Sequence, residues 1–384
     1  MKKAYLEIRP LWTVLACGLA TLLTPPMASA KPAPAIEVRV ETTLPTAETN
    51  RPALALDGKQ GTFFKSSRSA DEHDQFTIYF SHGVKLKRIE VLTGDQQSTN
   101  QLAAGVLEVS TDGKEFKEVA KFEAGVSKAK LKSLPVMAVR IRPIKKDQTA
   151  QEPTGRGQFR RNRGSLVLRE IVLDPAPVVA KVTQAMCVMV DTSEVPELDA
   201  WGLHAKALCE EWYPKLVALM PSEGFEPVLS TRLLFKKDKG GVADTSRGTD
   251  INIAGKYVIG HTNDFGMVIH ELTHVVQAYP GPKDGFSKPG WLVEGIADNI
   301  RLFHFEPNVR RPRIDPDRAK YTDAYKTTAG FLDWVESHYD KELVKKFNAA
   351  LRDGEFQDTL WQKYTGKTVD ELWKEFTDSL RKSV

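Results

Sequence analysis

The stretch HELTH, which begins at residue 270, carries two histidines four positions apart and a glutamate directly after the first. Residues three and four positions apart are neighbours on a helix, so His270 and His274 share one face, and an apolar stripe occupies the opposite face. Two imidazoles that point together away from a core are the arrangement that holds a zinc ion on a helix. Glu271, beside them, is the residue type that takes a proton from an attacking water. The stretch therefore predicts a catalytic zinc site.

A catalytic zinc ion usually has three protein ligands and one open position, so two histidines do not complete a site. Glu294 follows His274 by 20 residues and offers the third ligand, because this interval is enough for a turn and a returning helix. Asp298 lies one helical turn further on and can accept a hydrogen bond from the outer N–H of a zinc-bound histidine. Asp264 precedes the HELTH helix and can cap its N-terminus.

The chain after residue 182 mixes strands and helices in the manner of an α+β domain. A strand-like run, AMCVMVD, precedes a helix near 197–220, and two further strand-like runs are STRLLFKKD and TDINIAGKYVIGH. We expect the second of these to be an exposed edge strand, whose free backbone groups can pair with a peptide substrate. A strand that only covers the core is the alternative. Helical periodicity predicts the remaining helices at about 264–279, 290–303, 320–338, 340–353 and 368–382.

Residues 31–174 have the pattern of an all-β domain. Short alternating runs such as QFTIYF, LKRIEVLTG and VLEVSTDG recur between turn residues, which is typical of a sandwich or barrel. The proline- and alanine-rich stretch DPAPVVAK, at 174–181, closes this block. We therefore predict a β-domain over 31–175 and a second domain over 176–384.

The first 30 residues predict a removable export signal. A basic start precedes the short apolar run LWTVLACGLATLL, and Ala28-Ser29-Ala30 has the small side chains of a cleavage site. A lipoprotein signal at Cys17 is the alternative, although the apolar run before it is short. Cleavage leaves no segment that would anchor the chain across a membrane, so a periplasmic or secreted protein is expected.

Export would leave Cys187 and Cys209 in an oxidising compartment. They form either a disulfide or two buried thiols that pack as small apolar side chains. The formal net charge is +4, and the predicted export signal accounts for part of it. A balance this mild indicates no nucleic-acid partner.

HELTHVVQAY and GWLVEGIADNIRL resemble the basic secretory protein family of plant and bacterial peptidases, within the gluzincin group that includes thermolysin. The similarity runs from about residue 185 to the C-terminus. It implies a zinc-dependent peptidase with a zincin-like fold, in which His270, His274 and Glu294 hold the metal. Glu271 matches the general base of this family, and Asp298 matches the supporting carboxylate.

Peptide hydrolysis also needs a hydrogen-bond donor for the oxygen that becomes negatively charged. Tyr321 and Tyr325 are the candidates, because they are four positions apart and follow soon after the predicted zinc helices. Packing within a helix is the alternative role for both tyrosines.

ALDGKQGTFFKSS, KRIEVLTG, LEVSTDGKEFKEV and LREIVLD resemble the coagulation-factor type C family of discoidin-like, galactose-binding-like domains. The match covers about 36–174 and implies a jelly-roll sandwich that often binds glycans or cell surfaces. It also implies a calcium site, for which Asp57, Thr62 and Glu170 supply oxygen donors. A plain turn at Asp57-Gly58 is the alternative.

The segment DQTAQEPTGRGQFRRNRG, at 147–164, departs from that family pattern by its arginines. Arginines around an aromatic ring can hold an acidic sugar or a phosphate, although charge runs are usually solvated. The candidate ligand-binding residues of this segment are Arg156, Phe159, Arg160, Arg161 and Arg163.

Together these features predict a multidomain protein: a jelly-roll sandwich followed by an α+β zincin-like catalytic domain. We expect an exported zinc endopeptidase whose sandwich directs it to glycoproteins or cell-surface polymers. The alternative is a catalytically inactive glycan-binding or adhesion protein with a structural zinc site, against which the presence of Glu271 argues. Zinc-dependent hydrolysis of a non-peptide bond is a third hypothesis.

Overall fold

The computed structural model describes residues 35–382, except 48, 60, 96–98, 145–164, 283–285 and 312. These residues lie within one compact unit, Ala35–Val384. The predicted export signal is outside the described residues. Within the described part of the chain, no helix has the length and apolar character that a membrane crossing needs.

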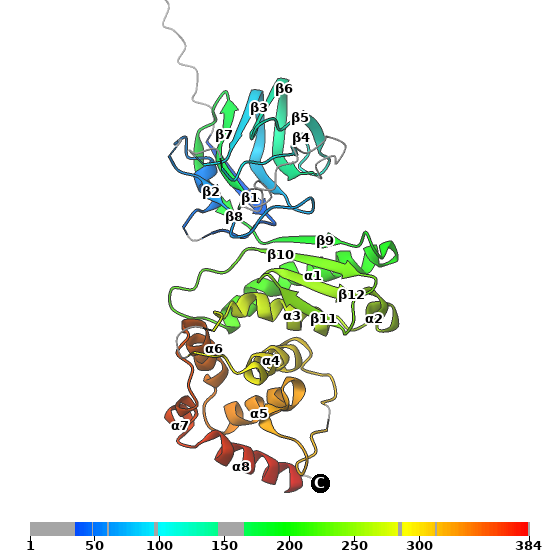
Figure 1. The fold of residues 1–384 in the computed structure, drawn as a ribbon, viewed down its shortest axis with the longest axis vertical. Helices are drawn as coiled ribbons and strands as arrows, with labels where there is room; N and C mark the ends of the chain where they lie inside the picture. Colours follow the sequence, from blue (N-terminus) through cyan, green and yellow to red (C-terminus); the bar gives the residue numbers. More distant parts are fainter. Residues whose placement is uncertain are drawn as a thin grey trace, which may run out of the picture. The chain divides into compact units, whose positions relative to one another are not determined.

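The N-terminal domain is an antiparallel β-sandwich, shown from blue to green in Figure 1. Two long strands, β3 (Phe76–Thr93) and β6 (Val126–Pro143), pair with each other along most of their length, with shifts in register. β1 (Ile36–Thr42) pairs with the first half of β3, and β7 (Val167–Asp174) pairs with the second half. Alternate side chains of β1 are buried in the sandwich core, as the period of two predicts. The other strands are β2 (Phe64–Lys65), β4 (Gly105–Ser110), β5 (Lys117–Lys121) and β8 (Val179–Gln184).

Strand β8 lies beyond the predicted domain boundary at 175/176 but belongs to the first sheet. It pairs in parallel with β1, from Val179 opposite Ile36 to Gln184 opposite Val40. The next strand, β9 (Cys187–Asp191), belongs to the second sheet. The proline- and alanine-rich stretch therefore enters a strand of the sandwich, and the chain passes from one sheet to the other between Gln184 and Cys187.

The second sheet has four strands in the order β11-β12-β10-β9. β9, β10 (Ser230–Lys236) and β12 (Asp250–Ala254) are parallel, whereas β11 (Ala243–Ser246) is antiparallel to β12. The prediction that TDINIAGKYVIG is an edge strand is wrong. Its first part is the internal strand β12, and residues Gly255–Gly260 form a helix, α2. The edge strand beside β12 is β11, whose short polar sequence ADTS has no apolar alternation from which a strand could be predicted.

Two helices pack on this sheet and on each other. α1 (Asp199–Leu219) contacts β9, and α3 (Gly266–Gln277), which carries the HELTH residues, contacts β11 and β12. The N-cap residue of α3 is Phe265, and the predicted cap Asp264, one residue earlier, accepts a hydrogen bond from the N–H of Met267 in the first turn. Cys187 and Cys209 are separate buried thiols, which matches the second of the two alternatives for this pair.

The C-terminal third is helical (Figure 1). α4 (Gly290–Asn299) continues into a π-helical turn (Ile300–Phe305), and a break at Ala324 separates the 3-10 turn Tyr321–Asp323 from the helix that follows it. The helix predicted at about 290–303 therefore runs to Phe305 with a π-helical end, the helix predicted at about 320–338 is shortened at its start, and helix α7 was not predicted. The remaining helices are α5 (Tyr325–His338), α6 (Leu343–Asp353), α7 (Thr359–Thr365) and α8 (Val369–Lys382).

A glycine lets α4 and α5 approach closely. A Cβ atom on Gly295 would lie 2.2 Å from Cγ2 of Thr328 on α5, which is far inside van der Waals contact. Any larger residue at 295 would push α4 away from α5. Because the preceding residue is Glu294, this close packing fixes where the predicted third zinc ligand lies.

A buried arginine joins the two domains. Arg232 on β10 is 1% exposed and donates two hydrogen bonds to the carboxylate of Asp250 on the neighbouring strand. Its other terminal nitrogen, Nη1, lies 2.7 Å from Oδ1 of Asp71 in the sandwich domain. A buried guanidinium is costly unless it is fully paired, so Asp71 is part of the second domain's stability.

We expect Asp71→Asn to lower the free energy of unfolding by about 1–3 kcal/mol, because it leaves the Arg232 charge only partly paired. The Asp71 side chain is 32% exposed, which keeps the loss below that of a fully buried pair. Urea unfolding of the full chain measures the effect. Glu226→Gln is the matched control: it breaks the exposed interdomain pair with Arg51 and should cost less than about 0.5 kcal/mol. Equal losses in both variants would contradict the argument.

Candidate metal centre and catalytic cleft

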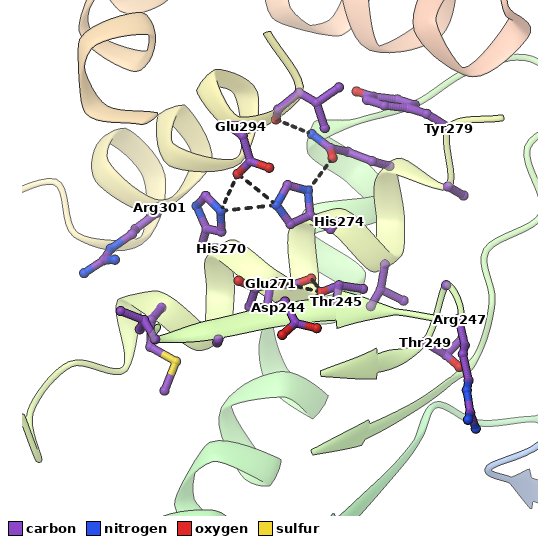
Figure 2. A pocket seen from close by; sticks show the side chains of 18 of the residues that line it. Asp244, Thr245, Arg247, Thr249, His270, Glu271, His274, Tyr279, Glu294 and Arg301 are labelled. Carbon is purple, nitrogen blue, oxygen red and sulfur yellow. Dashed lines mark hydrogen bonds and ion pairs between the residues drawn. The ribbon is translucent and has the colours of Figure 1, made fainter. Parts of the chain in front are cut away.

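Side chains from α3 and α4 converge on one point, as predicted. Nε2 of His270 lies 3.2 Å from Nε2 of His274 and 3.1 Å from Oε2 of Glu294, and the His274 nitrogen lies 3.3 Å from the same oxygen. Figure 2 shows the two rings and the carboxylate directed at each other. Among the described residues, these three are the group whose ligand atoms lie close enough together to hold a metal ion.

The outer nitrogens of both rings are held by acceptors. Nδ1 of His270 lies 2.7 Å from Oδ1 of Asp298, and Nδ1 of His274 lies 2.7 Å from Oε1 of Gln277. The Gln277 amide nitrogen donates to the carbonyl of Val293, so its oxygen is the atom that faces the histidine. An Nδ1 that donates to an acceptor leaves the Nε2 lone pair of a neutral ring free for a metal.

The histidines and Glu294 strongly affect each other's pKa values. Burial alone would lower the pKa of His270, but hydrogen bonds to Asp298 and Glu294 raise it to about 9. Burial raises the pKa of Glu294, whereas the two histidines lower it to about 2. The centre therefore favours one added positive charge between two nitrogens and an oxygen. The donor set and its outer partners fit zinc, which binds imidazole and carboxylate ligands.

Glu271 lies in the wall between α3 and the sheet edge. Its side chain is 7% exposed, and Oε2 accepts a hydrogen bond of 2.8 Å from the hydroxyl of Thr245 on β11. Both residues line a cavity of about 1030 Å³ that also includes His270, His274 and Glu294. The predicted general base and the predicted metal ligands thus share one cavity, and the edge strand forms its opposite wall (Figure 2).

The structure distinguishes the two candidate tyrosines. Tyr325 lines the cavity, and its ring stacks on that of His270 with centroids 6.0 Å apart. Glu294 first, and burial second, raise the pKa of Tyr325, so its phenol keeps the proton that it can donate. Tyr321 instead packs against Trp291 and Trp373 in the helical core, so it does not belong to the site. The spacing of four residues would place both tyrosines on one helix face, but the helix is interrupted between them.

The break between Tyr321 and Tyr325 requires a strained backbone conformation. Ala324 and Tyr325 have φ angles of 62° and 47°, in the left-handed region that side chains with a Cβ atom disfavour. Such strain persists where the surrounding structure demands it, and it concentrates at functional sites. Here it begins α5 with the Tyr325 ring directed to the metal centre.

The predicted calcium ligands also lie together. The Thr62 hydroxyl donates to Asp57 at 2.8 Å, while Glu170 is buried and its Oε2 has no hydrogen-bond partner in the described part of the chain. Burial first, and the charge of Asp57 second, raise the pKa of Glu170 to about 7. A buried carboxylate oxygen without a partner, next to another carboxylate, fits a calcium ion. Calcium at this place remains a prediction.

The arginine-rich segment with Arg156, Phe159, Arg160, Arg161 and Arg163 lies outside the described residues. Sequence reasoning missed two residues of the centre. Gln277 lies on the same face of α3 as the two histidines, and this shared face could have indicated that it contacts one of them. Thr245 gave no signal, because its strand was not predicted.

Comparison with protein families supports both resemblances. Residues 216–376 match the family model described as peptidases of plants and bacteria, BSP, and residues 38–156 match that of the F5/8 type C domain. Both predicted resemblances are therefore confirmed, and the second part of the chain is peptidase-like. No curated protein matches the chain.

Several solved structures are similar at low identity. A CBM32 domain from a family 31 glycoside hydrolase of Clostridium perfringens is 17% identical, with 35% of this chain and 92% of that chain covered and a TM-score of 0.28. The CBM32-1, CBM32-2 and M60 catalytic domains of ZmpB from C. perfringens are 14% identical, with 35% and 14% covered and a TM-score of 0.27. The family 32 CBM of C. perfringens NanJ, in complex with galactose, is 16% identical, with 35% and 92% covered and a TM-score of 0.26.

We expect Gln277→Leu to weaken zinc binding by about 10- to 100-fold, because His274 loses the acceptor that orients its ring. Competition with a chromophoric chelator measures the affinity. Gln362→Leu is the control, since Gln362 is exposed on α7, and it should leave the affinity unchanged. Glu294→Ala should cause a larger loss than Gln277→Leu, because it removes a ligand. Unchanged zinc affinity in Gln277→Leu would refute the role of the amide.

Proposed function

We propose that the protein is an exported zinc-dependent endopeptidase that acts on glycoproteins or cell-surface polymers. The observation that carries this proposal is the shared cavity: three metal-ligand side chains, a buried glutamate beside them, and an open strand edge as the facing wall. The match to a peptidase family over 216–376 supports the same chemistry.

His270, His274 and Glu294 would hold the zinc ion. A zinc ion supplies Lewis-acid chemistry that makes hydrolysis efficient near neutral pH. Asp298 and Gln277 hold the two imidazoles in the orientation that exposes Nε2, so their role is to keep the ligands in place before the ion binds.

Glu271 acts as the general base. It follows His270 directly, lines the same cavity and has one carboxylate oxygen held by Thr245. Its carboxylate takes a proton from the attacking water and returns it to the leaving amine, which splits the peptide bond without a covalent enzyme intermediate. Tyr325 donates a hydrogen bond to the carbonyl oxygen as negative charge develops there.

The free edge of β11 would bind the substrate. An extended peptide can add to an open strand edge through main-chain hydrogen bonds, which do not depend on side-chain identity. This mode suits an endopeptidase and gives no reason for the hydrolysis of a small non-peptide bond. The sandwich domain supplies the expected preference for glycans, on the strength of its match to the F5/8 type C family.

The basic and apolar start of the sequence, with its small-residue cleavage pattern, supports export to the periplasm or the medium. Glycoproteins and surface polymers are substrates that such a location makes available. Binding through the sandwich would raise the local substrate concentration at the cleft without new contacts at the metal centre.

A proteomic cleavage screen tests the function. The full chain should cut unfolded and glycosylated proteins, and a chelator should abolish the cuts until zinc is restored. Glu271→Gln should keep its zinc and lower kcat by orders of magnitude, because only the proton shuttle is lost. Cleavage by this variant at the wild-type rate, or cleavage insensitive to the chelator, would contradict the proposal.

Tyr325→Phe tests the proposed oxyanion donor. We expect kcat to fall on the order of 100-fold with KM little changed, because the hydrogen bond forms chiefly in the transition state. Tyr321→Phe removes the same hydroxyl from a tyrosine packed in the helical core, and it should leave kcat within about twofold of the wild type. Equal effects of the two substitutions would exclude a specific role for Tyr325.

A further inference from the structure

The contact between Thr245 and Glu271 joins the edge strand to the general base. The Thr245 hydroxyl lies 2.8 Å from Oε2 of Glu271 and 3.0 Å from its main-chain carbonyl oxygen. A hydroxyl has one proton to donate, and the charged oxygen at the shorter distance is the stronger acceptor. The hydrogen bond therefore runs from β11 to the carboxylate (Figure 2).

This hydrogen bond restricts the Glu271 side chain. A glutamate has three rotatable bonds, and one that moves freely reaches the attacking water only part of the time. Thr245 holds Oε2, so the other carboxylate oxygen, Oε1, remains available for the proton. Positioning of this kind lowers an activation barrier because the reacting groups need not be reoriented in each turnover.

The main chain of Thr245 faces the open edge. Directly before β11, the Val242 carbonyl accepts a hydrogen bond from the N–H of Ala254 on β12, and within β11 Thr245 lies opposite Ile251. Antiparallel pairs alternate between hydrogen-bonded and non-hydrogen-bonded, so Asp244 directs its main-chain groups to β12, whereas Ala243 and Thr245 direct theirs away from it. Thr245 thus offers its N–H and C=O to a strand that adds at the edge.

We propose that Thr245 is a positioning residue that ties substrate binding to the orientation of the general base. Its main chain pairs with the bound peptide, and its hydroxyl holds the Glu271 carboxylate. A peptide that orders β11 thereby also orders the Glu271 carboxylate. Part of the binding energy between substrate and strand is then used to position the base, which raises kcat. The inference rests on the proposed function, because it assigns Glu271 the role of the base.

The purely structural alternative is that Thr245 only packs the strand on α3. In that case its loss would lower stability or metal content and would affect KM and kcat together. A positioning role predicts a selective loss of kcat. A serine at this position keeps the hydroxyl without the methyl group, so it separates the hydrogen bond from the packing.

Three variants of the full chain test the proposal, with an extended fluorogenic peptide from the cleavage screen as substrate. Thr245→Val keeps the branched shape and removes the hydroxyl. Thr245→Ser keeps the hydroxyl. Thr77→Val on β3 is the control outside the cavity, because the Thr77 hydroxyl is buried without a hydrogen-bond partner among the described residues. Each variant is measured for kcat, KM, zinc content and melting temperature.

We expect Thr245→Val to lower kcat by about 10- to 100-fold while KM and zinc content stay at wild-type values. Thr245→Ser should retain kcat within about threefold, and Thr77→Val should match the wild type. Wild-type kcat in Thr245→Val, failure of serine to restore kcat, or a loss explained by reduced zinc content would overturn the inference while the proposed function stands. Absence of chelator-sensitive cleavage by the wild type would instead overturn the proposed function, and with it the role of Thr245.

Discussion

The structure depends on holding two imidazoles and a carboxylate at hydrogen-bond distance around one point. Neutral rings and an ionised carboxylate repel each other there through their lone pairs unless a proton or a cation lies between them. Helix geometry brings His270 and His274 together, but Glu294 must come from a separate helix. The packing of Gly295 against Thr328 and the hydrogen bonds that the histidines donate to Asp298 and Gln277 hold these groups in position.

The second sheet positions Glu271, the proposed general base. α3 lies on β11 and β12, so the residue after the first histidine is directed to the strand edge and is nearly buried there. A base in this wall is screened from bulk water, which strengthens its interactions with the groups around it. The same strand is an edge of the sheet, so the proposed site for a peptide and the proposed general base share one short strand.

The sandwich domain contacts both the second sheet and the cavity. Its Asp71 pairs with the buried Arg232 on β10, and its residues Pro45 and Ser67 line the cavity that contains the candidate metal ligands. A substrate held by the sandwich would therefore meet the cleft from a fixed side. The stability of the second sheet and the access of substrate to it both involve the first domain.

The sequence by itself determined the local features: the helix carrying HELTH, the position of Glu294 beside the two histidines, the contact of Asp298 with His270 and the β-rich first domain. These follow from spacing along one helix and from alternation along one strand, which are local periodicities. The edge strand β11, the contacts of Thr245 and Gln277, the position of Tyr321 away from the cavity and the placement of β8 were decided by tertiary structure. ADTS becomes a strand because β12 lies beside it, and Tyr321 leaves the site because the chain breaks at Ala324. Contacts between segments distant in sequence have no periodic signal, so only packing could reveal them.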